Sequence, residues 1–318
     1  MPRPQVPARL VDVLLLLVAV VWGSTYLAAK ELVTPTTVIA ALALRFSVTV
    51  LAMLPVCLRR LRGVGRDEAV TGILLGTILA VIFLFETYGI AHTSATNAGL
   101  IISLTIVMTP LLDSAVSRSW LPPRFFVAAV MAVVGVALLA SGNGLRVPSA
   151  GDWLVLIAAG VRAVHITVMH RRSAGKQYDS LNLTYLQMAT AAVLFCLASP
   201  LAGDSFVSLA RQLGPGQWVD LLYLALICTV FAFFVQMWAV RTTSPSRVSL
   251  LLGTEPVWAL LVGVLLGGDR LGMYGVAGAV LILVGAGWGQ RIERGHRERA
   301  AAPAPAVERT VEPAANQA

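Results

Sequence analysis

Two stretches 140 residues apart, VDVLLLLVAVVWGSTYLAAK at 11–30 and GDWLVLIAAGVRAVHITVMHRR at 151–172, share a long apolar run interrupted by a few polar positions. Two further pairs align at an offset of 150: TSATNAGLIISLT (93–105) with TSPSRVSLLLGTE (243–255), and VVGVALLA (133–140) with LVGAGWGQ (283–290). Weak self-similarity over this distance indicates that the chain contains two copies of one structural unit.

The composition excludes a soluble protein. Of the 318 residues, 57% are hydrophobic and 13% are charged, whereas a soluble domain has about 45–50% and about 25%. A spanning helix needs about 20 mainly apolar residues. Ten such runs lie near 10–30, 34–57, 69–90, 94–115, 124–141, 152–170, 183–202, 218–240, 246–267 and 271–290. The predicted fold class is therefore an all-α membrane protein with ten transmembrane helices.

The basic residues predict how the chain is oriented. If the N-terminus is cytoplasmic, 18 of the 24 Lys and Arg residues fall on the cytoplasmic side, four on the other side and two, Arg45 and Arg162, within the spans. Lys and Arg gather on cytoplasmic loops, so both termini are expected in the cytoplasm of a multi-pass protein of the cell inner or plasma membrane. This asymmetry also explains the net charge of +8, and no nucleic-acid partner is predicted.

Each copy of the repeat holds five spans, and because five is odd the second copy enters the membrane from the opposite side. The ten helices then form two inverted five-helix repeats, which places a pseudo-twofold axis in the membrane plane. Rocking one repeat against the other exposes a midplane site to each side in turn. Solute transport is therefore the leading functional interpretation.

The predicted boundaries are 1–9 for a cytosolic tail, 10–142 for the first repeat, 143–151 for an extracytoplasmic linker, 152–290 for the second repeat and 291–318 for a cytosolic tail. The last segment is rich in Arg, Glu, Ala and Pro and has no apolar periodicity, which is typical of disorder. The basic leader before the first run is similar to a signal peptide, but the apolar run that follows is longer than a signal peptide requires.

Four groups of motifs resemble those of one transporter family. They are Trp22-Gly23-Ser24-Thr25 in the first span, Ala43-Leu44-Arg45-Phe46 in the second, TSATNAGLI at 93–101 leading to Pro110 in the fourth, and Thr254-Glu255-Pro256-Val257 followed by LLGGD at 265–269 in the ninth. In this order the chain resembles, over about residues 10–290, the EamA-type members of the drug/metabolite transporter superfamily. The resemblance implies ten helices in two EamA repeats and efflux of small metabolites.

Several charged or polar side chains lie within spans, where a charge costs on the order of 3 kcal/mol and therefore faces the bundle interior. The candidates for a coupling or structural buried charge are Arg45, Glu86 and Glu255. The candidates for solute binding are Trp22, Thr25, Asn97, Arg162, His165 and Gln236.

Arg162 and His165 are three residues apart and therefore share one face of the predicted sixth helix. Trp22 and Thr25 occupy the same two positions in the first repeat, so we expect the four side chains to face one central cavity. An arginine and a histidine beside a tryptophan suit a solute with a carboxylate or phosphate group. In the resemblance, His165 and Arg162 stand where such helices usually carry aromatic or small residues, so no known substrate is carried over.

Alternatives stay open for the charged residues. Arg162 either binds solute or forms a structural ion pair with Glu86 or Glu255. Glu255 precedes Pro256, which cannot donate a backbone hydrogen bond, so the ninth helix is expected to kink there. A buried carboxylate at a kink either carries a proton or holds the repeats together in a salt bridge. Arg45 is expected to tie the second helix to neighbouring carbonyls or to an acid.

No GxxxxGK[ST] or HExxH motif occurs, and no catalytic residue, cofactor or metal is assigned. The chain is predicted not to be an enzyme. The expected partners are a small-molecule solute, the lipid bilayer and, if a buried carboxylate is coupled, protons. Export of an amino acid or related organic solute is favoured; import is the alternative, followed by an intramembrane enzyme or a scaffold. Glycines in the tenth span predict close helix packing, within a monomer or between the chains of a homodimer.

Overall fold

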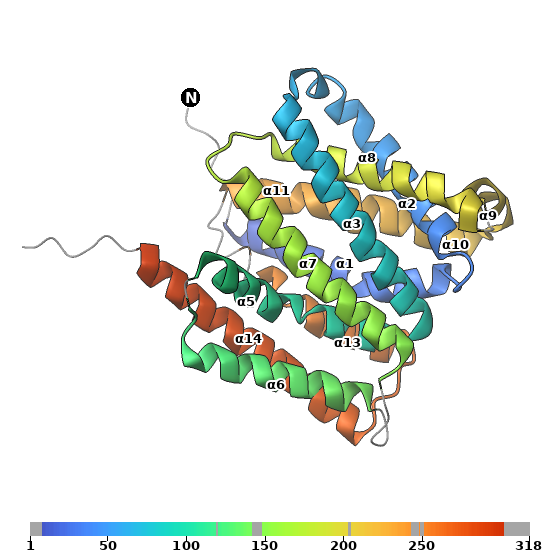
Figure 1. The fold of residues 1–318 in the computed structure, drawn as a ribbon. Helices are drawn as coiled ribbons and strands as arrows, with labels where there is room; N and C mark the ends of the chain where they lie inside the picture. Colours follow the sequence, from blue (N-terminus) through green and yellow to red (C-terminus); the bar gives the residue numbers. More distant parts are fainter. Residues whose placement is uncertain are drawn as a thin grey trace, which may run out of the picture.

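The computed structural model describes residues 8–118, 120–141, 148–202, 205–242, 248 and 251–301, and all regular structure in these residues is helical (Figure 1). The α-helices are α1 (Ala8–Leu32), α2 (Val38–Cys57), α3 (Arg66–His92), α4 (Ala95–Ile102), α5 (Thr105–Ser117), α6 (Pro123–Ala140), α7 (Ala150–Ser173), α8 (Ser180–Ala198), α9 (Phe206–Gln212), α10 (Pro215–Leu222), α11 (Ala232–Thr242), α13 (Glu255–Leu265) and α14 (Met273–Ala301). Two 3-10 turns, η1 (Leu61–Gly63) and η2 (Ser199–Ala202), and a π-helix, η3 (Tyr223–Phe231), complete the set.

Nine helical segments of the described chain are long and apolar enough to cross a membrane. One of them is formed by α4 with α5, and another by α10 with η3 and the start of α11. The ninth predicted span, 246–267, contains α13, which is shorter than the other nine, and the helical residues 251–252 before it. The all-α membrane fold with two inverted five-helix repeats, predicted from the sequence, is confirmed.

Most principal helix contacts between the repeats occur twice. If each helix is replaced by its equivalent in the other repeat, one contact becomes the other. The packing of α3 on α7 corresponds to that of α1 on α10, η3 and α11, and the packing of α3 on α8 corresponds to that of α2 on η3. Similarly, α1 packs on α13 as α4 and α5 pack on α7. Three contacts join equivalent helices: α2 with α8, α4 with α13, and α6 with α14. This pattern is what a pseudo-twofold axis between the repeats requires.

Glycines allow the close contact between α6 and α14, which lie side by side in Figure 1. A Cβ on Gly278 of α14 would lie 2.5 Å from the carbonyl oxygen of Gly135 in α6, and a Cβ on Gly135 would lie 2.8 Å from the carbonyl oxygen of Gly278. A Cβ on Gly285 would meet the carbonyl oxygen of Ala128 at 2.8 Å. These glycines of the tenth span therefore serve packing inside the bundle.

Two spans are discontinuous at corresponding places in the repeats. A turn at 103–104 separates α4 from α5, and a turn at 253–254 precedes α13. Pro256 lies in the first turn of α13. A backbone N–H at this position has no acceptor within the helix, so a proline here breaks no hydrogen bond. The kink predicted at Glu255 is therefore a break just before that residue, and the sequence analysis did not predict the matching break in the first repeat.

The C-terminal boundary also differs from the expectation. The helix α14 continues to Ala301, so residues 291–301, which were expected in a disordered tail, are helical. The composition accounts for this, because Arg, Glu and Ala all favour the helix over irregular backbone. The rest of the predicted tail, the segment 1–7 and most of the linker 143–151 lie outside the described residues.

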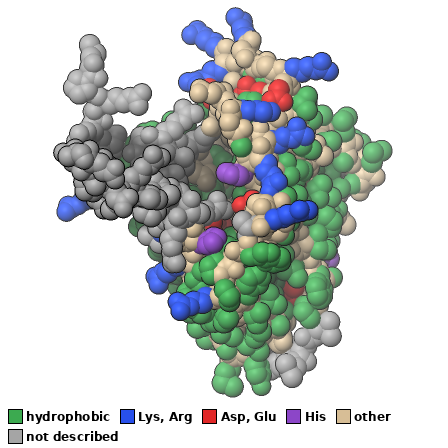
Figure 2. All heavy atoms as spheres, turned by 60° about the vertical axis from the view of Figure 1, so that its left-hand side comes forward, with side chains coloured by type: hydrophobic (Ala, Val, Ile, Leu, Met, Phe, Trp, Pro, Cys, Tyr) green, Lys and Arg blue, Asp and Glu red, His purple; other side chains and the backbone are tan. Residues whose placement is uncertain are grey.

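The two ends of the bundle differ in charge. We call the end at which α2, α5, α7 and α14 finish the basic end; its described basic residues are Arg9, Arg59, Arg60, Arg62, Arg66, Arg118, Arg124, Arg171, Arg172, Lys176, Arg291 and Arg294. Figure 2 shows Lys and Arg side chains gathered over this end, next to the hydrophobic sides of the bundle. We call the opposite end, at which α1 and α3 finish, the Asp152 end, after a buried carboxylate in the first turn of α7.

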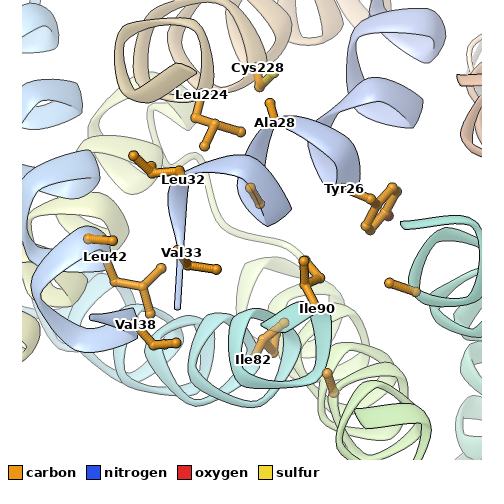
Figure 3. Packing of buried hydrophobic residues seen from close by; sticks show 14 of the residues in the cluster. Tyr26, Ala28, Leu32, Val33, Val38, Leu42, Ile82, Ile90, Leu224 and Cys228 are labelled. Carbon is orange, nitrogen blue, oxygen red and sulfur yellow. The ribbon is translucent and has the colours of Figure 1, made fainter. Parts of the chain in front are cut away.

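Buried hydrophobic side chains fix α1 against α2, α3 and η3 (Figure 3). Leu32 of α1, Leu42 of α2, Ile82 of α3 and Leu224 of η3 are each at most 4% exposed. Tyr26 of α1 lies on the side of the helix that faces α4, where its ring would contact a Cβ placed on Gly99. The core therefore sets the position from which Tyr26 reaches the polar centre of the bundle.

Candidate functional site

An ion pair joins α3 to α7 in the middle of the bundle. Nη2 of Arg162 donates to Oε2 of Glu86. The Glu86 side chain is 5% exposed and that of Arg162 is 30% exposed. A charge inside a membrane protein is tolerated when it is paired with an opposite charge. Of the two acids considered as ion-pair partners of Arg162, the structure selects Glu86.

A second carboxylate, Glu255, begins α13 and accepts a hydrogen bond from the hydroxyl of Tyr26 at 2.8 Å. Tyr26 is 2% exposed. Glu255 also interacts electrostatically with Arg162 and Glu86. The break before α13 places this carboxylate at the N-terminus of a half-helix, where the helix dipole favours a negative charge. The broken span thus positions Glu255 beside the ion pair.

Arg45 of α2 is 6% exposed and is held by contacts of a different kind. Its Nη2 donates to Oγ1 of Thr229 in η3 at 3.4 Å, and its Cζ lies 4.9 Å from the centroid of the Phe83 ring. Its guanidinium also interacts electrostatically with Glu86. The hydrogen-bond acceptor of Arg45 is therefore a hydroxyl, in place of the carbonyl or carboxylate that we expected.

Arg45, Glu86, Arg162 and Glu255 form a row of charges that alternate in sign. Arg45 interacts electrostatically with Glu86, Glu86 is paired with Arg162, and Arg162 interacts with Glu255. The first two residues belong to the first repeat and the last two to the second. Any displacement of one repeat against the other therefore changes the pairing within this row.

Trp22 and Thr25 lie together on the side of α1 that contacts η3. Nε1 of Trp22 donates to the carbonyl oxygen of Cys228 at 3.0 Å, and the Trp22 ring packs edge-on against Phe233 with centroids 5.7 Å apart. The hydroxyl of Thr25 donates to the carbonyl oxygen of Val21 at 3.2 Å. The π-helix thus presents a backbone carbonyl to α1, and π-helical turns occur frequently at functional sites.

His165 is 8% exposed and faces α8, with its Nε2 2.8 Å from Oε1 of Gln187. Nε2 of Gln187 donates to the carbonyl oxygen of Leu183 at 3.2 Å, which orients the amide so that its oxygen faces the histidine. Nε2 of His165 is therefore the donor in this pair. The imidazole interacts electrostatically with Arg162.

Asn97 lies apart from this group. Nδ2 of Asn97 donates to Oδ1 of Asp152 at 3.2 Å at the Asp152 end. Asp152 precedes Arg162 by ten residues of α7, about 15 Å along a helix. Gln236 is half-buried in α11. The structure therefore brings together the four charged residues Arg45, Glu86, Arg162 and Glu255 and places Asn97 near one end of the bundle.

Sequence reasoning missed Tyr26 and Tyr223. Tyr223 of η3 shares a hydrogen bond of 2.7 Å with the hydroxyl of Ser24. Both tyrosines lie within apolar spans, and a tyrosine there carries a polar tip that needs a partner, which is a signal that could have identified them. Tyr26 also directly follows the motif ending at Thr25.

The described residues contain no group of three or more His, Cys, Asp and Glu side chains arranged to hold a metal ion. The cysteines at 57, 196 and 228 are free, and two of them are buried. The polar side chains of the site are thus those of the alternating row and its tyrosine and threonine neighbours.

Comparison with known proteins agrees with this architecture. A protein of Archaeoglobus fulgidus named an uncharacterized transporter is 28% identical over 274 residues, which are 86% of this chain and 83% of that protein. The Escherichia coli K12 protein named uncharacterized inner membrane transporter YedA is 28% identical over 152 residues, 46% of each chain. One protein of known crystal structure superposes with a TM-score of 0.58 at 19% identity, covering 90% of this chain and 97% of the other, which indicates the same fold.

The profile of the EamA-like transporter family matches this chain twice, over residues 9–141 and 149–288. The two matches account for most of the chain and coincide with the two halves whose helices exchange under the pseudo-twofold axis. A multi-pass membrane protein with this repeat is a transporter by family, and its partners include a small-molecule solute and the lipid bilayer. The chain belongs to the EamA-like transporter family.

Proposed function

We propose that this protein is a secondary transporter that exports a small organic solute, an amino acid or a related metabolite, across the cell inner membrane by alternating access. The observation that carries the proposal is the row of alternating charges inside the bundle, to which both repeats contribute. Buried charges inside a membrane protein are costly and mark solute or ion pathways. Because two of these residues belong to each inverted repeat, rocking one repeat against the other moves the charges of the row relative to each other.

The solute site in this proposal lies around Arg162 and His165, with Trp22 and Thr25 on the opposite side. The Arg162 side chain is 30% exposed, which leaves part of it within reach of an incoming group while the pair with Glu86 is intact. The ring of Trp22, which packs against Phe233, offers an apolar surface on the α1 side of the proposed site. Gln236 of α11 adds a polar group on the η3 side, and Asn97 takes part in closing the Asp152 end.

Glu255 is the proton-carrying group in the proposal. Its hydrogen-bond donor is the neutral hydroxyl of Tyr26, whereas Arg162 donates to Glu86. Protonation of Glu255 therefore leaves the Arg162 ion pair intact. Loss of that proton restores a second negative charge next to Arg162 and changes the net charge of the row.

The basic end is cytoplasmic in this proposal, and both termini lie inside the cell. The described basic residues concentrate at the end where α2, α7 and α14 finish, which follows the preference of Lys and Arg for cytoplasmic loops. The repeats extend over 10–142 and 152–290.

The transport proposal is tested by comparative metabolomics of medium and cytosol in cells with and without the protein. A solute that moves from cytosol to medium without chemical change supports export, and the reverse shift supports import. A new product in place of a redistributed solute would contradict transport and favour an enzyme.

Coupling is tested in reconstituted vesicles with the redistributed solute. An imposed pH gradient should drive its flux through the wild type, and Glu255→Gln should leave only flux down the solute gradient. Solute flux through the wild type that does not depend on the pH gradient would refute proton coupling. Transport unchanged by both Arg162→Ala and His165→Ala would refute the solute site on α7.

A further inference from the structure

An apolar cavity of about 80 Å³ lies between α2, α8 and the junction of η3 with α11. The residues that α2 contributes to its lining are Ala52, Met53, Val56 and Cys57. The only hydroxyl in the lining belongs to Thr184 of α8, and it donates to the backbone carbonyl oxygen of Ser180 at 2.8 Å. The cavity therefore offers space to a hydrocarbon group and little to a polar one.

The cavity opens to the side of the bundle. Two of its lining residues, Val56 and Phe234, are 59% and 61% exposed. The neighbouring Leu51 and Leu58 of the same stretch are 66% and 55% exposed. Apolar side chains on the outside of a membrane-spanning helix face the hydrocarbon of the bilayer. An apolar chain can thus enter this cavity directly from the lipid.

The cavity lies within one leaflet, next to the basic end. Ala52, its innermost residue on α2, precedes Arg59 by seven residues, which is about 10 Å along a helix. The hydrocarbon of one leaflet is about 15 Å thick, half of the bilayer core. The distance from Arg59 to the inner end of the cavity is therefore shorter than the depth of one leaflet.

Two arginines lie one helical turn beyond the cavity on the same side of α2. The backbone stays helical through Arg60, whose N–H donates to the carbonyl oxygen of Cys57 at 2.9 Å. Arg59 follows Val56 by three residues, and Arg60 follows Cys57 by three, a spacing that places side chains on one face. The Cys57 thiol also interacts electrostatically with Arg60 and with its partner Asp179.

The surface around these arginines carries an excess of positive charge. Arg59 is exposed, and no carboxylate of the described chain lies within 4.0 Å of it. Arg60 uses Nη1 for Asp179 and is 53% exposed. The segments 58–68 and 171–180, which Arg60 and Asp179 join, together hold seven basic and three acidic residues. A negatively charged group is therefore attracted to the mouth of the cavity.

We infer that an anionic phospholipid binds here, with one acyl chain in the cavity and its phosphate at Arg59 and Arg60. An apolar cavity below a basic surface matches a molecule that joins a hydrocarbon chain to a negative headgroup. Because α2 belongs to the first repeat and α8, η3 and α11 to the second, this lipid contacts both repeats. The inference goes beyond the proposed transport function and does not depend on which solute is carried.

The test measures thermal stabilisation of the purified protein in mixed micelles by dioleoylphosphatidylglycerol and by dioleoylphosphatidylcholine, which has the same chains and no net charge. We expect the anionic lipid to bind wild type more than 10-fold more tightly. Arg59→Gln should weaken its binding about fivefold and the double variant with Arg60→Gln about 25-fold, as about 1 kcal/mol per basic residue at an anionic membrane surface corresponds to about fivefold. Binding of the zwitterionic lipid should change less than twofold.

Matched controls separate this site from general effects of charge and volume. Arg124→Gln removes an exposed arginine at the same end of the bundle, on α6, and should change binding less than twofold. Ala52→Trp should fill the cavity and weaken binding, whereas Leu51→Trp, outside the cavity, should not. Glycerol 3-phosphate, a headgroup without chains, should not stabilise the wild type. Folding of each variant is verified by its own unfolding transition without added lipid.

Equal binding of the two lipids to the wild type would overturn the inference, as would equal losses in Arg59→Gln and Arg124→Gln, which would indicate attraction by the basic end as a whole. Stabilisation by glycerol 3-phosphate as strong as that by the anionic lipid would leave a phosphate site and refute the lipid. Full binding by a folded Ala52→Trp variant would refute the role of the cavity.

Discussion

The two ends of the bundle are closed by contacts of opposite character. At the Asp152 end, the Asp152 side chain is 4% exposed and accepts hydrogen bonds from Thr93 Oγ1 at 2.6 Å and Asn97 Nδ2 at 3.2 Å. Asp269, which follows α13, accepts from the backbone N–H of Thr96 at 2.8 Å. These contacts join the end of α3 and the start of α4 in the first repeat to the second repeat, and the Asp152 carboxylate among them is buried.

At the basic end the side chains that join the repeats include exposed ion pairs, beside one bond from the backbone N–H of Asp179 to Oε1 of the buried Glu68 at 3.1 Å. Nη1 of Arg60 lies 2.8 Å from Oδ2 of Asp179, and Nζ of Lys176 lies 2.6 Å from Oδ2 of Asp67. The four side chains are between 30% and 59% exposed. The hydroxyl of Tyr178 also donates to Asp67. Water and salt replace such contacts easily.

This difference indicates at which end the two repeats separate first. Breaking a buried hydrogen bond to a carboxylate leaves polar groups without partners, whereas breaking an exposed ion pair exchanges it for hydration. The basic end can therefore separate at a lower cost than the Asp152 end. Substitutions at the centre and at each end can measure this order.

The largest loss of stability is expected for the Arg162–Glu86 ion pair, which lies at the centre of the bundle between the two ends. Arg162→Met leaves the buried Glu86 carboxylate without its cation and should lower the free energy of unfolding by about 3–5 kcal/mol. The measurement is a denaturant titration in mixed micelles. The double variant Arg162→Met with Glu86→Met should recover most of the loss, and a double variant as unstable as the single one would contradict this account.

The next largest effect is expected at the Asp152 end. Asp152→Ala removes the acceptor for Thr93 and Asn97 and one half of the capping box with Ser149, and should cost about 3 kcal/mol in the same titration. Glu31→Gln, an exposed carboxylate near the end of α1, is the matched control and should have little effect. Equal losses in both variants would mean that burial of Asp152 is unimportant.

A smaller loss is expected from Gly263→Ala, at the contact of α13 with α4. The added Cβ would lie 2.9 Å from the backbone nitrogen of Thr96 and would also contact its hydroxyl, so the helices must shift at a cost of about 2 kcal/mol. Gly216→Ala, where a Cβ has open space, is the control. A melting temperature unchanged by Gly263→Ala would show that this end is less tightly packed than the contacts indicate.

The smallest effect is expected at the basic end. Arg60→Ala should cost less than about 1 kcal/mol, and the loss should vanish in high salt because the pair with Asp179 is exposed. A double-mutant cycle with Asp179→Asn at low and high NaCl isolates the pair. A coupling energy as large as that of Asp152 with Asn97 would reverse the inferred order of the two ends.

The same end should weaken at high pH. The Asp67 carboxylate, which accepts a hydrogen bond from Lys176, raises the pKa of that lysine above its ordinary value. A lysine with a raised pKa in the folded state stabilises the protein below its unfolded pKa and loses that contribution as the pH rises through the folded value. Stability of the wild type should therefore fall in this alkaline range, and Lys176→Gln should remove that part of the decline.

The sequence predicted the charged groups of the site better than their neighbours. A charged residue within an apolar run can be recognised from the sequence alone, and this identified Arg45, Glu86, Arg162 and Glu255. Tyr26 was missed because its role depends on a hydrogen bond to a residue 229 positions away.

The irregular backbone was predicted only in part. The break before α13 carries a proline as a signal, but the turn at 103–104 between α4 and α5 has none. The π-helix η3 was also not predicted, because its sequence, YLALICTVF, is as apolar as any regular span. Hydropathy reports how apolar a segment is and carries no information on its hydrogen-bond register.

The sequence by itself determined that the chain lies in a membrane, that its spans form two inverted repeats, and which charges must face inward. These properties are sums or periodicities along the chain, because transfer into the bilayer depends on each segment's own composition. Only the tertiary structure decided that Glu86 pairs with Arg162, that Glu255 bonds to Tyr26, and that Arg45 donates to the Thr229 hydroxyl. Pairing depends on distances between helices far apart in sequence, which packing of the two repeats alone sets.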